Sequence, residues 1–142
     1  MRKITYCFLG FTICASLVSC SPTKGNVFSL DSGDCFNADS LGEVGEVKVL
    51  DCNSSHEYEV FAGFKVPSGE WPGYTSLGNT ADAECESRFK SYVGIDYENS
   101  SWFITWLVPT EESWNQVDDR DATCVLYGYF GTTSRAARNS RS

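Results

Sequence analysis

Seven cysteines are distributed along this chain of 142 residues, and their positions constrain the fold more than any other feature. Cys7 and Cys14 lie in an apolar N-terminal segment, and Cys20 follows directly after it. The other four cysteines form an even set, which in an exported domain of this size predicts a disulfide framework. Four cysteines allow three pairings, and their number alone does not select one. The four are Cys35, Cys52, Cys85 and Cys124.

The first nineteen residues have the order of features of a secretory signal peptide. Arg2 and Lys3 supply positive charge, and residues 4–18 form an apolar stretch that is too short to span a bilayer comfortably. The closing residues LVSC (17–20) resemble the lipobox of bacterial lipoproteins. In that family the cysteine sulfur receives a diacylglyceryl group before the signal peptide is removed. The resemblance implies a lipidated Cys20 on the outer face of the cell membrane, and a plain signal peptide is the alternative.

The chain that follows the signal peptide is short and acidic. Removal of the signal peptide would leave 142 − 19 = 123 residues, which suits one domain, with a charge of (11 − 2) − 19 = −10. Such a body repels phosphate backbones, which argues against nucleic acid as a partner. Residues 135–142 differ, because they contain Arg135, Arg138 and Arg141 and no carboxylate. We expect a flexible basic tail there, with contact to an anionic wall polymer or lipid headgroup as the alternative.

The first half of the chain predicts a tether followed by two strands. Residues 20–32 begin as a polar stretch with Pro and Gly, which suits a tether. Alternation of polar and apolar side chains predicts half-buried strands at 46–50 and 57–66. In the second strand Tyr58, Val60, Ala62, Phe64 and Val66 would share one face, and Glu57, Glu59 and Lys65 the other.

A helix and two further strands complete the predicted domain. A loop at 67–80 precedes a helix that starts at Asn79 or Thr80, carries Cys85 on its apolar face and ends at Gly94. The apolar run 102–108 predicts a central strand, Thr110 caps a short helical turn at Trp114, and 122–130 is the last strand.

Cys85 on the helix and Cys124 on the last strand can meet where the helix packs on the sheet. This layout favours the pairings 85–124 and 35–52. The elements predict an α+β domain over residues 33–134, a small and mainly antiparallel sheet with one principal helix packed on it.

The stretch DCNSSHEYEV (51–60) contains the one histidine of the chain, His56. Cys52 and His56 have a spacing compatible with zinc, but a zinc site needs three or four such ligands and no second histidine exists. Nucleophilic catalysis needs a base beside a free hydroxyl or thiol, and cysteines in disulfides are not thiolates. We therefore expect no catalytic residue, no metal and no cofactor. His56 is given a structural role, with a hydrogen bond to a backbone carbonyl, Glu57 or Glu59.

Acidic residues are too numerous to mark a site by themselves. A pair at a separation suited to glycan cleavage would arise by chance among nineteen, so a glycan hydrolase stays an alternative without named residues. The acidic loops 31–34 and 118–121 could offer oxygen ligands to Ca²⁺, but neither has the EF-hand spacing. We interpret both as solvated turns.

Aromatic side chains are the remaining candidates for recognition. Trp71 and Tyr74 lie in the 67–80 loop, where an exposed ring could bind a partner or stack on a sugar. A lid over the core is the preferred interpretation of Trp71. Trp102, Trp106 and Tyr127 are expected in the core.

The order of short motifs resembles a known family. Gly33-Asp34-Cys35-Phe36, Cys52-x₃-His56 and Glu59-Val60-Phe61 are similar to the septum-formation domain of exported and membrane proteins in high-GC Gram-positive bacteria. The resemblance covers about residues 33–134 and departs from the family at Asp118-Asp119-Arg120, where Gly-Asp-Arg is frequent. Further matches, in order, are Val49, Pro72-Gly73, Cys85, Tyr92-Val93-Gly94, Pro109, Trp114, Arg120, Cys124 and Gly131-Thr132-Thr133-Ser134.

The resemblance implies an envelope protein associated with septation or cell-wall growth and no established reaction. We expect a lipid-anchored, non-enzymatic module that binds a division or wall-synthesis protein through Trp71 and Tyr74. The alternatives are a wall-polymer binder that uses Trp71 and the arginine tail, and the glycan hydrolase.

Overall fold

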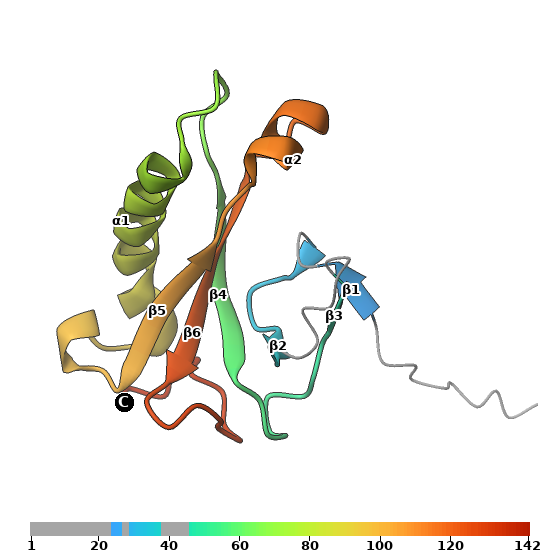
Figure 1. Cartoon of the computed structure of the whole chain (residues 1–142). Helices are drawn as coiled ribbons and strands as arrows, with labels where there is room; N and C mark the ends of the chain where they lie inside the picture. The colour runs from blue at the N-terminus through green and yellow to red at the C-terminus, as the bar shows by residue number, and fades with distance from the viewer. Residues whose placement is uncertain (1–23, 27–28, 38–45) are drawn as a thin grey trace, which may run out of the picture.

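The computed structural model describes residues 24–26, 29–37 and 46–142. The main sheet is antiparallel with the strand order β2-β4-β6-β5, and one long helix packs on it (Figure 1). The α+β fold with one principal helix on a small antiparallel sheet is thus confirmed. The sheet strands are β2 (Cys35–Phe36), β4 (Tyr58–Lys65), β5 (Trp102–Leu107) and β6 (Asp121–Gly128). The other elements are β1 (Lys24–Asn26), β3 (Glu46–Lys48), α1 (Tyr74–Val93), η3 (Tyr97–Asn99) and α2 (Glu111–Gln116).

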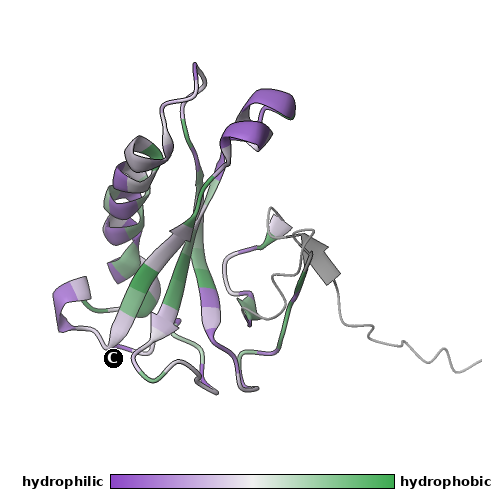
Figure 2. Cartoon of the chain, viewed as in Figure 1, coloured by the Kyte–Doolittle hydropathy of each residue, from purple (hydrophilic) through white to green (hydrophobic). Residues whose placement is uncertain are grey.

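The main core lies between α1 and the sheet. Figure 2 shows hydrophobic residues along the strands and on the side of α1 that faces them, and hydrophilic residues on the outer side of α1 and on α2. Phe61 of β4 meets Phe89 of α1 edge-to-face, with ring centroids 6.2 Å apart. Such burial of apolar side chains is the principal force that holds a helix on a sheet.

Two disulfides fix the layers. Cys85–Cys124 joins α1 to β6, and Cys35–Cys52 joins β2 to the loop before β4. Both pairings that the sequence favours are confirmed. With sequence separations of 17 and 39, loop closure in the unfolded chain gives contributions of about 3 and about 4 kcal/mol.

Helix α1 begins earlier than the sequence predicts. Its N-cap is Gly73, so residues 74–79 are helical instead of a loop, whereas the predicted end at Gly94 is confirmed. Gly78 favours a loop in the sequence, but here it allows a close approach. A Cβ at this position would lie 2.8 Å from the ring of Trp106 on β5. Glycine has a low helix propensity, but at this position a larger residue would collide with the neighbouring strand.

Strand β4 contains a bulge, which changes the alternation of its side chains. Its pairing with β6 shifts register between Val60 and Ala62. Phe61 belongs to the core cluster beneath α1, and Val60 belongs to the cluster on the opposite side of the sheet. The prediction that Glu59 lies on a polar face is wrong, because this side chain is 1 % exposed. An extra residue in one strand resets which face each side chain meets.

The apolar run of β5 predicts a strand at the centre of the sheet. In the structure β5 lies at the edge. Helix α1 packs on one of its faces. On its other face, Phe103 stacks on Tyr127 of β6, with ring centroids 5.4 Å apart. Because apolar groups cover both faces, the sequence of an edge strand here looks like that of a central one.

Part of the predicted tether belongs to the folded domain. Strand β1 pairs with β3 in a separate two-stranded sheet. The Gly33 amide donates to the Val60 carbonyl oxygen over 2.8 Å, which holds the turn at 31–34 against β4. Within the predicted tether over residues 20–32, residues 24–26 and the turn at 31–34 thus make backbone contacts with the rest of the chain, and residues 20–23 and 27–28 lie outside the described residues.

None of the helices in the described part of the chain is long and apolar enough to cross a membrane.

Gly78 offers a direct test of the contact between α1 and β5. We expect Gly78→Ala to lower the free energy of unfolding by about 1–3 kcal/mol, because the added methyl group overlaps the Trp106 ring. Chemical denaturation of the oxidised protein measures this change. The control is Ser76→Ala on the exposed side of the same helix, which should be neutral or slightly stabilising. Equal stabilisation by both substitutions would contradict the close approach.

Candidate binding surfaces

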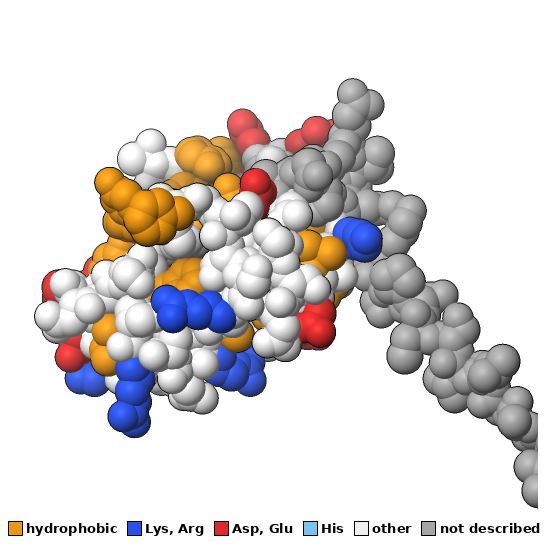
Figure 3. Space-filling view, turned by 90° about the horizontal axis from the view of Figure 1, so that it is seen from below, with side chains coloured by type: hydrophobic (Ala, Val, Ile, Leu, Met, Phe, Trp, Pro, Cys, Tyr) orange, Lys and Arg blue, Asp and Glu red, His pale blue; other side chains and the backbone are white. Residues whose placement is uncertain are grey.

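A tight turn at the end of β6 exposes two aromatic rings. The Gly131 amide donates to the Gly128 carbonyl over 3.1 Å, which places Tyr129 and Phe130 at the tip, 74 % and 92 % exposed. Tyr129 also lies 6.1 Å, centroid to centroid, from Phe103 on β5. Figure 3 looks onto this end of the molecule and shows hydrophobic side chains beside Lys and Arg side chains. We call Phe103, Tyr129, Phe130 and Arg135 the basal surface.

The sequence reasoning missed this surface. It placed Tyr129 and Phe130 inside a strand over 122–130, but β6 ends at Gly128. The signal was present, because glycines at 128 and 131 bracket the two rings and glycine is frequent at turn positions. An aromatic pair between such glycines indicates a turn tip rather than a buried strand end.

The last residues pack on the domain, so the prediction of a flexible tail over 135–142 is wrong. Ala137 is fully buried. The Asn139 amide donates to the Tyr92 carbonyl over 2.8 Å, and the Arg141 amide donates to the Val93 carbonyl over 3.0 Å. We call residues 135–142 the C-terminal arm. Its backbone hydrogen bonds to the end of α1 are the physical reason for its order.

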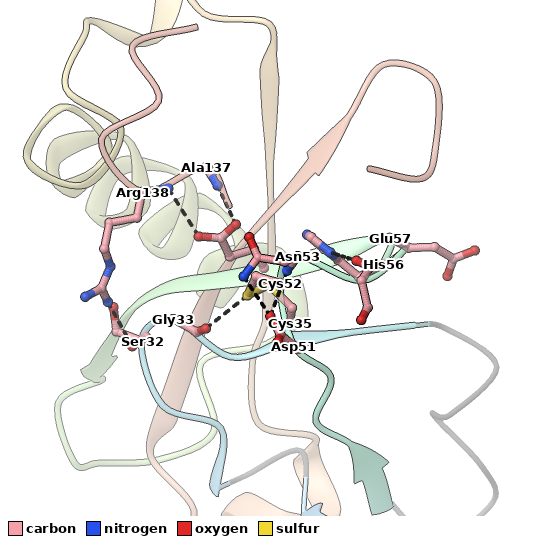
Figure 4. Close-up of a disulfide and its surroundings, with 12 residues drawn as sticks. Ser32, Gly33, Cys35, Asp51, Cys52, Asn53, His56, Glu57, Ala137 and Arg138 are labelled. Atoms are coloured by element: carbon pink, nitrogen blue, oxygen red, sulfur yellow. Dashed lines mark hydrogen bonds between the residues drawn. A yellow bond between two sulfur atoms is a disulfide. The ribbon is translucent and has the colours of Figure 1, made fainter. Parts of the chain in front are cut away.

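The buried carboxylate of Glu59 anchors the arm. Its Oε2 accepts a hydrogen bond from the Ala137 amide at 2.6 Å, and its Oε1 accepts from the Tyr92 hydroxyl at 2.6 Å and the Arg138 amide at 3.3 Å. The Arg138 guanidinium donates to the Ser32 carbonyl at 3.0 Å (Figure 4). A buried carboxylate is costly unless several donors satisfy it, and here three do so.

The same contact changes the acidity of Tyr92. Burial, followed by the hydrogen bond to the Glu59 carboxylate, raises the pKa of Tyr92 far above its usual range. The guanidinium of Arg138 lies 5.0 Å from the centroid of the Tyr92 ring and acts in the opposite direction. Tyr92 therefore stays a hydrogen-bond donor at neutral pH.

His56 holds the entry to β4, as expected, and uses a backbone carbonyl. Its ring Nδ1 lies 2.9 Å from the Ser54 carbonyl oxygen, which makes Nδ1 the protonated nitrogen. Its backbone exchanges two hydrogen bonds of 2.8 Å with Thr133, which attaches the segment after the aromatic turn. The ring is fully buried, and Nε2 has no hydrogen-bond partner among the described residues. His56 thus connects the start of β4 to the basal surface.

One group of metal-type ligand atoms lies close together in the described part of the chain. The sulfurs of Cys35 and Cys52 and a carboxylate oxygen of Glu59 lie within 4.8 Å of one another. The two sulfurs form a disulfide, and Figure 4 shows this bond beside the Gly33 carbonyl. A disulfide sulfur cannot act as a thiolate ligand, and the Glu59 oxygens accept hydrogen bonds from the arm.

The acidic loops use their carboxylates in local contacts. The Asp31 amide donates to the Asp34 carboxylate at 2.9 Å. Asp118 pairs with Arg120 at 2.8 Å. The Arg120 guanidinium also lies 3.6 Å from the centroid of the ring of Trp114, which is buried. Asp118, which departs from the glycine frequent in the family, thus pairs with the arginine that packs on this tryptophan.

Trp71 and Tyr74 lie at the opposite end of the molecule from the C-terminal arm (Figure 1). Trp71 is half-buried and meets the buried Trp114 edge-to-face, with centroids 5.5 Å apart. Tyr74 is 62 % exposed, and its ring lies 5.6 Å from that of Trp106. The Trp106 indole N–H donates to Asp82 over 2.7 Å, which fixes the ring beneath Tyr74. We call Trp71, Tyr74 and Trp106 the distal surface.

These features define a small α+β domain, cross-linked by two disulfides, with aromatic surfaces at both ends. The chain belongs to the septum formation family, whose model matches residues 29–139. This range spans 139 − 29 + 1 = 111 of the 142 residues and includes Glu59 with all three of its hydrogen-bond donors. No curated protein and no solved structure matches the sequence. Family membership gives the chain a role related to septum formation.

Glu59→Gln tests the anchor of the arm. The amide keeps the shape but presents an N–H group where backbone N–H groups converge, so we expect a loss of about 1–3 kcal/mol in the free energy of unfolding. Limited proteolysis should also cut the arm faster. Glu86→Gln on the exposed side of α1 is the control and should change neither measurement. An unchanged arm in Glu59→Gln would show that Glu59 does not hold it.

Tyr92 predicts a dependence of stability on alkaline pH. The unfolded chain releases the tyrosine proton near the ordinary pKa of about 10, while the folded protein retains it to higher pH. The contribution of Tyr92 to the free energy of unfolding should therefore keep its full value below about pH 10 and fall above it. In Tyr92→Phe, stability is lower at neutral pH and this alkaline decline shrinks. Tyr127→Phe, the control, should keep the decline of the unsubstituted protein.

Proposed function

We propose that this chain is a lipid-anchored, non-enzymatic interaction module on the outer face of the cell membrane. In this role it binds a division or wall-synthesis protein during septum formation. The observation that carries the proposal is the distal surface, where Tyr74 presents an exposed ring on a fixed aromatic support. The family supplies the process, and the surface supplies a means of contact.

The distal surface has the properties of an anchor point for a protein. Tyr and Trp are enriched among the residues that dominate binding energy, because they bury large areas with little loss of rotamer freedom. Hydrogen bonds hold two of the underlying indoles. Trp106 donates to Asp82, and Trp114 donates to the Gly69 carbonyl over 3.0 Å. A partner that covers Tyr74 would therefore meet a preorganised surface.

The state of the reactive groups supports a non-enzymatic role. The imidazole of His56 is fully buried with Nδ1 on a backbone carbonyl. Cysteines 35, 52, 85 and 124 form disulfides. Glu59, the one fully buried carboxylate among the described residues, accepts three hydrogen bonds from the fold itself. These groups are occupied in maintaining the domain, which supports binding over catalysis.

The contacts of Trp71 and Arg138 favour a protein partner over a wall polymer. Sugar recognition by stacking needs an accessible indole face, whereas Trp71 packs against Trp114 as a lid. The Arg138 guanidinium contacts the Ser32 carbonyl and the Tyr92 ring. Both groups named for a wall-polymer binder thus have structural contacts.

The proposed anchor also limits the distance from the membrane. Cys20 lies outside the described residues and carries the lipid in this proposal. Four peptide bonds join it to Lys24, the start of β1, and such a length of chain spans at most about 14 Å. The domain would therefore lie close to the bilayer instead of extending away from it.

A photo-crosslinking residue at position 74 tests the proposed contact. In dividing cells that produce the protein, we expect Tyr74→benzoylphenylalanine to form a covalent adduct with one protein of the division or wall-synthesis machinery. The same residue in place of Glu86 on the exposed side of α1 is the control and should form none. Mass spectrometry of the purified adduct identifies the partner.

A second variant links the adduct to binding. Tyr74→Ala should reduce recovery of the identified protein by about tenfold or more, since the loss of an aromatic anchor typically costs 2 kcal/mol or more. Its thermal unfolding should stay near that of the unsubstituted protein because Tyr74 is largely exposed. Release of soluble wall fragments by the purified protein, with no adduct at position 74, would contradict the proposal.

A further inference from the structure

The basal surface combines exposed rings with positive charge. Tyr129 and Phe130 are in edge-to-face contact, with centroids 5.2 Å apart, and project from the turn together. A hollow of about 170 Å³ lies beside them, lined in part by Thr132 and Arg135. Large apolar rings are rarely left fully in water without a binding role when they lie together in one patch.

The C-terminal segment of the chain is opposite in charge to the rest of it. Residues 122–142 contain three arginines and no Asp or Glu, whereas the whole chain has a net charge of −8. The remaining residues 1–121 therefore sum to −8 − 3 = −11. The three arginines belong to the C-terminal arm, and hydrogen bonds of the Ala137 and Arg138 amides to Glu59 fix the arm backbone beside the basal surface. The positive groups are thus held in place and do not depend on a mobile tail.

We propose that the basal surface docks on the anionic lipid bilayer to which the chain is tethered, with Tyr129 and Phe130 at the level of the headgroups. Tyrosine favours the interface between water and acyl chains, because its ring is apolar and its hydroxyl is polar, and phenylalanine adds apolar surface that can be buried there. The exposed Arg135 side chain beside these rings would bind lipid phosphates, because charge attraction adds to apolar burial at such a surface. This pairing of chemistry favours an anionic membrane over an uncharged protein partner.

Weak contacts are sufficient for this docking. The lipid at Cys20, which is part of the proposed function, keeps the domain within a short chain length of the bilayer and so raises the local concentration of lipid. Without the first nineteen residues, residues 20–121 sum to −10 − 3 = −13. The repulsion between this acidic body and an anionic membrane would then favour contact through the C-terminal arginines. Docking at this end turns the distal surface away from the bilayer, because the two surfaces lie at opposite ends of the molecule (Figure 1).

The test compares two tryptophan variants of the full, lipidated chain reconstituted in vesicles. Phe130→Trp places the probe on the basal turn, and Val117→Trp places it on a residue that follows α2 and is 73 % exposed. The vesicles contain phosphatidylcholine brominated on its acyl chains, either alone or with an equal part of phosphatidylglycerol. Bromine quenches tryptophan only in contact, so the loss of fluorescence beyond that of the unsubstituted chain reports which end meets the lipid.

We expect a clear loss of fluorescence for Phe130→Trp in the vesicles with phosphatidylglycerol, a smaller loss in phosphatidylcholine alone, and none for Val117→Trp. The added substitution Arg135→Gln should reduce the loss, and raising the salt concentration should do the same. Equal quenching at both positions, or none at position 130, would overturn the proposal. Retention of the chain by purified wall polymer without quenching at position 130 would overturn it in favour of a wall contact.

The Tyr74 adduct described above forms independently of this quenching. Its absence with quenching intact would therefore reject the partner proposal alone. Its presence without quenching would reject the membrane proposal alone.

Discussion

A single buried carboxylate joins three parts of this domain that are distant in the sequence. Glu59 on β4 receives the hydroxyl of Tyr92 from α1 and the amides of Ala137 and Arg138 from the C-terminal arm. The sheet, the helix and the end of the chain thus share one polar junction inside an apolar core. Hydrogen bonds to an ionised acceptor are among the stronger ones, and leaving that acceptor unpaired in the interior is costly. The position of the basal arginines follows from this junction, because they belong to the segment that it fixes.

The two ends of the molecule are organised by different means. At the distal end, the hydrogen-bonded indole of Trp106 supports Tyr74, and the Arg120 guanidinium packs on the ring of Trp114. At the basal end, the turn between Gly128 and Gly131 exposes its rings, and His56 attaches the following segment through Thr133. Each surface is therefore attached to rigid strands or helices rather than to long loops. For the proposed contacts with a membrane and a protein, such an arrangement would keep both in a defined orientation.

Sequence reasoning predicted the architecture better than the surfaces. The fold class, both disulfides, the end of α1 at Gly94 and the cap at Thr110 follow from local rules of spacing, capping and pairing. The errors arose where tertiary contact overrides those rules. The pattern around Gly78 predicts a loop, because the sequence does not show that the Trp106 ring lies beside it. Alternation predicts a solvent-exposed Glu59, because it does not show the bulge after Val60. The ordered arm was missed because Glu59, which anchors it, lies 78 residues before Ala137 in the sequence, where no local pattern indicates the contact.

The order in which the chain is made gives the Glu59 junction a further consequence. Synthesis proceeds from the amino terminus, so the carboxylate is made well before the amides that satisfy it, with the helix and the last strand in between. Until those amides arrive, the core contains a charge that water must still reach, and the half-assembled body stays open to proteases. Chains that end before residue 137 would thus lack two of the three donors to Glu59 and should be degraded faster than the full chain.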